Sequence, residues 1–319
     1  QRHFFNKLKK SINSDLVSAY PDLFNLYNIL SKKLKISKKK VLLTQGADHA
    51  IKNCFEVFYK KNSNVIILDP TFVMVNIYCK IFKTKTIKIG YKKNLILDFD
   101  KLIKSLNKNV SMVILANPNS PSGTIISDKK ILEILHICRK KKIQLIIDEA
   151  YFEFSKSNSI KYLRKFSNLT IIRTFSKIYG LAGLRIGWGY GPKAIIKKLY
   201  QIKPPFNVSR PALFAATQAV QDTKWLNKAI MHNNFWAEKI FKVIEEIGIA
   251  TNRTNVNFFL LNFDFVNQSA SQVFNKLANS GILVRQMDVY SIKNSLRVTI
   301  GNSKENKKFI SILRKIFNV

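Results

Sequence analysis

The sequence predicts an α/β fold with a three-layer large domain, in which a mostly parallel sheet lies between helices, plus a smaller α+β domain. The length of 319 residues exceeds what one hydrophobic core usually organises, which predicts two units. Short β-branched runs also alternate with helix-length segments, and these runs are apolar on both faces, as in parallel strands covered by helices. The predicted strands of the large domain are 41–44, 65–69, 86–89, 112–117, 144–150 and 169–175.

Helix-length stretches lie between most of these strands, and 128–142 illustrates the pattern. Its apolar residues recur at helical spacing, with charged residues on the other side, so it is expected to cover the sheet with one face. The apolar residues are Ile131, Leu132, Leu135 and Cys138.

A smaller unit is predicted to follow the proline-bearing turn 202–208. It begins with a long, mostly helical region that ends near Ile247. The large domain is therefore assigned to 38–210, and the smaller one to 211–319 together with the helical segment 1–37. The further elements of the smaller unit are a strand at 258–263, a helix around 269–279 and strands at 282–286 and 295–300.

The formal net charge of +35 is the one compositional extreme, and by itself it suggests a nucleic-acid or acidic-membrane partner. The chain carries 54 Lys and Arg, of which we count ten Arg and therefore 44 Lys. These lysines are spread over nearly every predicted helix and form no arginine-bearing stripe, which is typical of solvated surfaces. We therefore expect no nucleic-acid partner.

The remaining composition indicates a cytoplasmic protein without a membrane span or a metal site. No stretch of about eighteen apolar residues runs unbroken, and the N-terminus has no apolar segment behind its charges. Cys54, Cys79 and Cys138 show no paired spacing, so buried thiols are expected instead of disulfides or zinc ligands.

Three motifs follow predicted strand ends, where α/β folds place their ligands. The first is NPNSPSGT at 117–124, which by itself could be a plain strand-to-helix connection. The second is Asp148-Glu149-Ala150-Tyr151, where the acid needs a buried partner or belongs to a structural ion pair. The third is TFSK at 174–177, followed by GLAGLRIG at 180–187; its lysine could be merely exposed.

The order and spacing of the three motifs resemble the fold type I, pyridoxal-phosphate-dependent aminotransferases of class I/II, and among them most closely the histidinol-phosphate aminotransferases. The resemblance runs from about Tyr20 to the C-terminus and is most specific in RTFSKIYGLAGLRIGWGYGP at 173–192. It implies that pyridoxal 5'-phosphate is the cofactor and that Lys177 carries it covalently and shuttles the substrate's proton. It also implies that Asp148 pairs with the pyridine nitrogen and that Tyr151 donates to the ring oxygen.

The same resemblance implies a binding site for the cofactor's phosphate and ring. Arg185, Thr174 and Ser176 would hold the phosphate with a guanidinium and hydroxyls. Gly46, Ala47 and Asp48 would offer backbone N–H groups at a helix N-terminus. Phe72 matches the aromatic residue that stacks on the ring, or else belongs to the core.

One position departs from the family pattern. The family commonly has an asparagine directly before the Pro-Thr-Gly of the first motif, to bond the ring oxygen, and here that residue is Ser120. Either Ser120 makes a shorter or water-mediated contact, or Asn119 or Asn117 substitutes for it. Our expectation is Asn119.

Substrate recognition is expected from two late arginines, Arg285 and Arg297. Each lies in a predicted strand, where a partly buried charge is costly unless it has a purpose, although surface ion pairs are the alternative. In the family the matching arginines hold the carboxylates of glutamate and the phosphate of the other substrate. Tyr20 matches a tyrosine that reaches the partner's cofactor phosphate, which implies a homodimer.

The resulting expectation is an aminotransferase that acts between glutamate and a small phosphorylated oxo compound, with imidazole acetol phosphate as the leading candidate. The family usually has an Asn-Glu-Asn-Pro-Tyr arm that residues 1–19 do not show, so the arm is either absent upstream or rebuilt for another substrate. The alternatives are decarboxylation of a phosphorylated amino acid and a non-enzymatic basic protein that binds polyanions.

Overall fold

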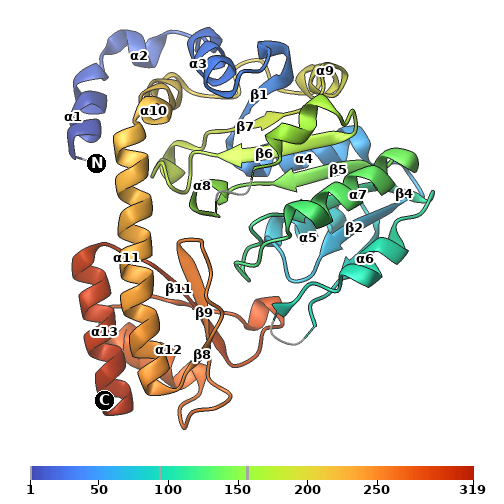
Figure 1. Cartoon of the computed structure of the whole chain (residues 1–319). Helices are drawn as coiled ribbons and strands as arrows, with labels where there is room; N and C mark the ends of the chain where they lie inside the picture. The colour runs from blue at the N-terminus through green and yellow to red at the C-terminus, as the bar shows by residue number, and fades with distance from the viewer. Residues whose placement is uncertain (1, 93–94, 156–157) are drawn as a thin grey trace.

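The computed structural model describes residues 2–92, 95–155 and 158–319, and its centre is a seven-stranded sheet (Figure 1). The strand order is β1-β7-β6-β5-β4-β2-β3, and only β7 runs against its neighbours. The mostly parallel sheet predicted from the alternation is thus confirmed. The strands are β1 (Val41–Thr44), β2 (Asn64–Leu68), β3 (Lys85–Ile89), β4 (Val110–Ala116), β5 (Gln144–Asp148), β6 (Leu169–Thr174) and β7 (Gly187–Tyr190).

Helices cover both faces of this sheet, because alternate strand residues bury apolar side chains on opposite sides. One face packs against α4 (Gly46–Phe58), α5 (Val73–Ile81) and α9 (Lys193–Gln201). The other packs against the following helices: α3 (Phe24–Leu34), α6 (Phe99–Ser105), α7 (Asp128–Lys140) and α10 (Arg210–Gln221). The three predicted layers are therefore present.

Strand β7 was not predicted, since two of its four residues are glycines, which are depleted in strands. It forms because it pairs on both sides, with β1 and with β6. Gly187 at its start also needs to be a glycine: a Cβ there would lie 2.7 Å from the carbonyl carbon of Gly46. The close approach brings the beginning of α4 against the end of β6.

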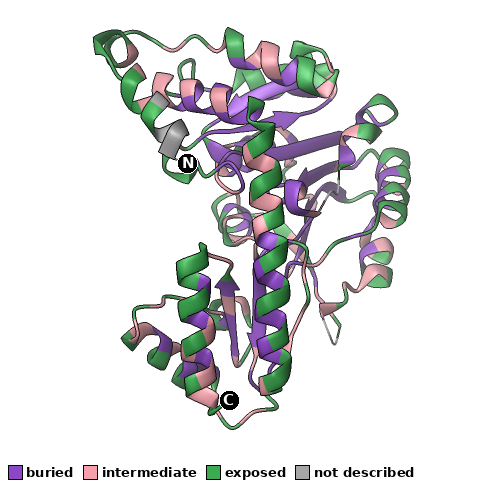
Figure 2. Ribbon diagram, turned by 60° about the vertical axis from the view of Figure 1, so that its left-hand side comes forward, coloured by how far each residue is buried: buried purple, intermediate pink, exposed green. Residues whose placement is uncertain are grey.

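A second, four-stranded antiparallel sheet forms the smaller unit, in the order β10-β11-β9-β8. The long helix α11 (Thr223–Ile247) runs from the first sheet to this one and packs beside α13 (Figures 1 and 2). Its purple residues in Figure 2 join those of the strands in one buried core. The further elements are β8 (Ala250–Thr251), β9 (Phe258–Asn262), α12 (Ala270–Asn279), β10 (Arg285–Gln286), η5 (Asp288–Tyr290), β11 (Ser295–Thr299) and α13 (Ser303–Phe317).

The N-terminal helices α1 (Arg2–Ser11) and α2 (Ser14–Ser18) contact α10, and α3 buries Leu26 and Leu30 in the core of the large sheet. The exact boundaries of the two units stay a prediction. Short turns complete the chain: η1 (Lys38–Lys40), α8 (Phe152–Ser155), η3 (Ser159–Arg164) and η4 (Ala182–Leu184). Within the part of the chain that the structure describes, no helix is long and apolar enough to cross a membrane.

A buried ion pair joins β5 to β6. Arg173 donates from Nε and Nη2 to Glu149 Oε2 over 3.0 and 2.7 Å, and both side chains are almost fully buried. The other carboxylate oxygen accepts the Ser159 N–H, and Arg173 Nη2 also donates to Asn158 Oδ1 over 2.8 Å. The Arg173 guanidinium stacks on Phe152, 3.4 Å from the ring centre. The pair therefore holds Asn158 and Ser159, which follow β5 in the chain, against β6.

We predict that Arg173→Met lowers the free energy of unfolding by about 3 to 5 kcal/mol, because Glu149 is left as a buried, unpaired charge. Urea unfolding followed by circular dichroism measures the loss. The double variant Arg173→Met/Glu149→Gln should recover part of it. Arg253→Met, which breaks only exposed ion pairs with Glu238 and Glu245, is the control and should change little. Equal losses in Arg173→Met and Arg253→Met would contradict the assignment.

Candidate functional site

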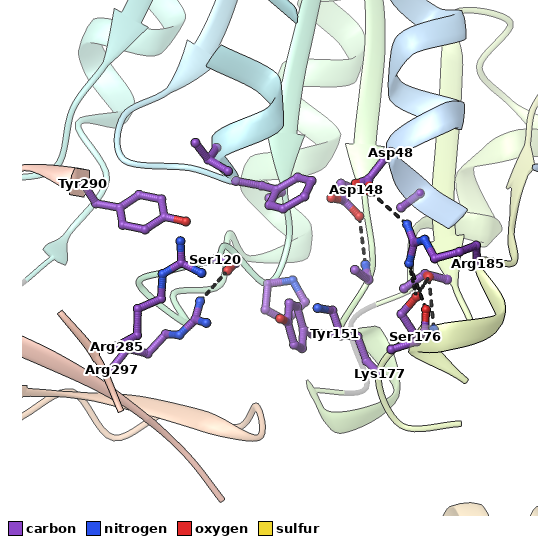
Figure 3. A pocket seen from close by; sticks show the side chains of 18 residues that line it. Asp48, Ser120, Asp148, Tyr151, Ser176, Lys177, Arg185, Arg285, Tyr290 and Arg297 are labelled. Carbon is purple, nitrogen blue, oxygen red and sulfur yellow. Dashed lines mark hydrogen bonds and ion pairs between the residues drawn. The ribbon is translucent and has the colours of Figure 1, made fainter. Parts of the chain in front are cut away.

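A cavity of about 250 Å³ lies where the large sheet meets the smaller one (Figure 3). It opens at the carboxyl ends of β4, β5 and β6, beside the N-terminus of α4, and β10 and β11 contribute its opposite wall. Most of the residues predicted from the sequence line it together. The lining residues are Ala47, Asp48, Phe72, Val73, Ala116, Pro118, Ser120, Asp148, Ala150, Tyr151, Thr174, Ser176, Lys177, Ala182, Arg185, Arg285, Tyr290 and Arg297.

Asp148 ends β5 and is the buried acid of the cavity, with 6% of its surface exposed. Burial raises the pKa of its carboxyl to about 6, against the lowering effects of the Ala150 N–H and of the Lys177 charge. The Ala150 N–H donates to Oδ1 over 3.0 Å. The second oxygen is thus left to face a cationic or N–H group of a ligand.

Lys177 follows β6 in a turn that the Gly180 N–H closes by donating to the Lys177 carbonyl over 2.9 Å. Its amine lies 5.0 Å from the centre of the Tyr151 ring. Among the described residues no carboxylate forms an ion pair with this amine. A half-buried lysine without a fixed acidic partner is available to react with a ligand.

Beside this lysine lies a group of N–H and hydroxyl donors, here called the anion cup, which consists of Arg185, Ser176, Thr174 and the N-terminus of α4. Arg185 donates from Nη2 to Asp48 over 3.0 Å and from Nη1 to Ser176 over 3.4 Å, which holds its guanidinium at the N-terminus of α4. Thr174 Oγ1 in turn donates to Ser176 Oγ over 3.0 Å. Helix α4 has no side-chain cap at Gln45, so its first N–H groups are open to an anion.

Gly46 opens α4 with a φ of +75°, which favours glycine, and it does not line the cavity itself. A Cβ on Gly46 would lie 2.8 Å from Nη2 of Arg185. The absence of a side chain at Gly46 therefore leaves space for the Arg185 guanidinium at the N-terminus of α4.

The structure brings Ser120 into the cavity and keeps Asn119 outside it. Asn119 donates from Nδ2 to the Pro70 carbonyl and to Ser122 Oγ, and its Oδ1 accepts from Thr71 Oγ1. These bonds hold the amide in the turn. Ser120 Oγ instead accepts from Arg297 Nη1 over 3.4 Å.

Arg285 and Arg297 face each other across β10 and β11. Among the described residues neither forms an ion pair, and Arg297 Nε is buried without a hydrogen-bond partner. A buried N–H of a guanidinium is costly to leave unpaired, so the arrangement favours an anionic ligand. Both side chains point toward the cavity in Figure 3.

Sequence reasoning missed Tyr290 among the lining residues, and it placed Tyr20 at the site. Tyr290 lies in the turn between the two arginine-bearing strands, and its place between Arg285 and Arg297 in the sequence was the available signal. Tyr20 is 78% exposed, stacks on Phe206 with ring centroids 4.3 Å apart, and does not line the cavity of its own chain.

The chain is similar to known proteins over almost its whole length. The family described as aminotransferase class I and II matches residues 3–313. A histidinol-phosphate aminotransferase of Pelagibacter ubique is 39% identical over 310 residues, which are 95% of this chain and 86% of the relative. Another from Caldicellulosiruptor saccharolyticus is 32% identical over 317 residues, 97% of this chain and 87% of the relative.

A solved structure agrees with these matches. The histidinol-phosphate aminotransferase from Clostridium acetobutylicum superposes with a TM-score of 0.90 at 25% identity, covering 99% of this chain and 95% of that one. The family and the fold expected from the three strand-end motifs are thus confirmed. The chain belongs to the family of class I and II aminotransferases.

Proposed function

We propose that the protein is a pyridoxal-phosphate-dependent aminotransferase that acts between histidinol phosphate and 2-oxoglutarate, with imidazole acetol phosphate and glutamate as the products. The observation that carries the proposal is a single cavity that joins a lysine, a buried acid, an anion cup and two arginines that pair with no acid among the described residues. The relatives at 39% and 32% identity bear the name of this activity.

The donor set of the cavity fits pyridoxal phosphate. An amine is present for the aldehyde, a carboxylate for the pyridine nitrogen, a phenol for the ring oxygen and an anion cup for the phosphate. Phe72 lines the same cavity and offers an aromatic ring. The residues that would hold the group are Lys177, Asp148, Tyr151, Ser176, Arg185, Thr174, Phe72 and the N-terminal backbone of α4 at Gly46, Ala47 and Asp48.

When bound, pyridoxal phosphate supplies a ring that withdraws electrons from the substrate's amino-bearing carbon. Asp148 would keep the pyridine nitrogen protonated, because its carboxylate lies in a buried site where a charge pair is strong. Lys177 Nζ, which lines the cavity, would take the proton from the amino-bearing carbon of the substrate and hold it for return. The half-buried site around Lys177 limits the access of water to this transfer.

The two arginines can bind the substrates of both half-reactions. Glutamate and histidinol phosphate each carry an oxyanion close to the amino-bearing carbon, and a guanidinium binds a carboxylate or a phosphate with the same fork. Arg297 is the partner for this group, since its Nε is buried and unpaired and its Nη1 reaches Ser120. One site can then serve both substrates in turn.

We further propose that the enzyme is a cytoplasmic homodimer. Tyr20 and Phe206 form an exposed stacked pair, with 78% and 53% of their surfaces exposed, and Phe24 nearby in the chain is also exposed. A large exposed apolar patch is typical of a protein interface. In the dimer, Tyr20 would reach the cofactor phosphate of the partner subunit.

The first test of the proposed function concerns Lys177. Added pyridoxal phosphate should give the purified protein a visible absorbance band that glutamate bleaches, and Lys177→Ala should lack the band. Borohydride reduction followed by peptide mass analysis should place the group on Lys177 alone. Lys140→Ala, which removes an exposed lysine on α7, is the matched control. Attachment of pyridoxal phosphate to another lysine, or the absence of a visible band in the wild type, would contradict the proposal.

The second prediction concerns Asp148 in the cofactor-free protein. Its pKa of about 6 lies above the ordinary 3.8, so the folded state binds more protons than the unfolded state between these values. Stability therefore falls as pH rises through this window, and above it the buried carboxylate costs about 1 to 3 kcal/mol. Asp148→Asn should thus unfold at higher urea than wild type at pH 7.5, but not at pH 4, while it binds pyridoxal phosphate more weakly.

A lower stability of Asp148→Asn at both pH values would contradict that electrostatic account. Asn retains an oxygen that can accept the Ala150 N–H, so the comparison isolates the charge. Urea unfolding of the cofactor-free proteins and fluorescence titration with pyridoxal phosphate are the two measurements.

The third prediction tests the shared site. Inactive Lys177→Ala and weakened Tyr20→Ala subunits should regain activity when they are mixed, unfolded and refolded together. A mixed dimer contains one site with both Lys177 and Tyr20. Activity that stays at the mean of the two parents would show that Tyr20 does not act across subunits, and sedimentation velocity would report the dimer separately.

A further inference from the structure

A series of side-chain contacts at the cavity leads from the lysine to the two arginines, by way of Phe258, which does not line the cavity itself. The Lys177 amine lies 5.0 Å from the Tyr151 ring centre, and the Tyr151 and Phe258 rings meet edge to face with centroids 5.1 Å apart. Phe258 lies in turn 5.1 Å from Cζ of Arg297. These contacts connect Lys177 to Arg297 through two aromatic rings.

The same wall continues from Arg297 to Tyr290. Arg297 faces Arg285 on the neighbouring strand, and Cζ of Arg285 lies 5.6 Å from the Tyr290 ring centre. Figure 3 shows the phenol group of Tyr290 directed into the cavity beside Arg285, well away from Lys177. Arg285 and Tyr290 thus form the outer end of the cavity.

Tyr290 is held in place by its backbone. It ends the short helical turn η5, and its N–H donates to the Met287 carbonyl over 2.9 Å. Met287 is fully buried, and its own N–H donates to the Ser295 carbonyl at the start of β11. The backbone of Tyr290 is therefore tied to the same small sheet that carries both arginines.

The two substrates of the proposed function, on which this inference rests, differ at their outer end. Each has an oxyanion near the amino-bearing carbon, which suits Arg297. Beyond it, glutamate has a second carboxylate, whereas histidinol phosphate has an imidazole ring with one N–H donor and one nitrogen acceptor.

Arg285 and Tyr290 differ in hydrogen-bonding capacity, and this difference matches the difference between the two substrates. A guanidinium only donates hydrogen bonds and binds a carboxylate with the help of its charge, but it cannot accept the imidazole N–H. A phenol hydroxyl both donates and accepts, so it can bond a neutral imidazole in either tautomer. We propose that Tyr290 is a specificity-determining residue that binds the imidazole ring, while Arg285 binds the outer carboxylate of glutamate.

The test is a pair of single variants, each measured with both amino substrates. Visible-band titrations of the pyridoxal-phosphate-loaded enzyme, with rapid mixing, give a saturation constant and a limiting rate for each half-reaction. Tyr290→Phe should raise the saturation constant for histidinol phosphate about threefold to tenfold, the size of one neutral hydrogen bond, and leave glutamate within about twofold. Arg285→Gln should raise the constant for glutamate by about tenfold and change histidinol phosphate less.

Tyr59→Phe is the matched control, since it also removes one phenol hydroxyl. Tyr59 follows the far end of α4, about 20 Å along that helix from the cavity, and should leave both constants unchanged. An equal rise for both substrates in Tyr290→Phe would overturn the inference, because the ring would then only support Arg285. No change for either substrate would overturn it as well.

Failure of the proposed function gives a different result. If glutamate bleaches the visible band of the wild type but histidinol phosphate does not change it, the substrate assignment fails before any variant is compared. If the wild type responds to both and Tyr290→Phe matches it, only the inference on Tyr290 fails.

Discussion

The site depends on the buried ion pair between Glu149 and Arg173. The two residues adjoin Asp148 and Thr174 in the sequence, but their side chains point away from the cavity and meet on the other side of β5 and β6. The pair also binds Ser159 and Asn158 and so ties these two residues to the end of β5 and to β6. Asp148 and the loop residue Tyr151 are thereby held relative to the segment that carries Lys177.

The charges inside the cavity explain why a highly basic chain can hold a selective site. Asp48 pairs with Arg185, so the anion cup depends on directed N–H and hydroxyl groups as well as on net positive charge. Asp148 is buried and costly when ionised, and a protonated ring nitrogen would offset this cost. The surface lysines, by contrast, are spread over the helices.

The two sheets divide the chemistry between them. The large sheet presents the lysine, the acid and the anion cup at the ends of parallel strands, where side chains from different strands meet. The small antiparallel sheet presents Arg285, Tyr290 and Arg297 from one short hairpin. The residues proposed to bind the substrates therefore belong to a different sheet from those proposed to transfer the proton.

The sequence by itself determined the parallel sheet and the location of Asp148, Tyr151 and Lys177 after strand ends, because apolar runs mark buried strands. The roles expected of these three residues came from the resemblance to the aminotransferases. It did not determine strand β7, whose glycines suit a strand only between β1 and β6. Nor could it decide between Asn119 and Ser120, which depended on the bonds that Thr71, Pro70 and Ser122 make with the Asn119 amide. Tyr290 joined the site through the fold of a turn. Local pattern predicts which residues form an element, but only packing between distant segments decides which side chain has a partner and which faces a ligand.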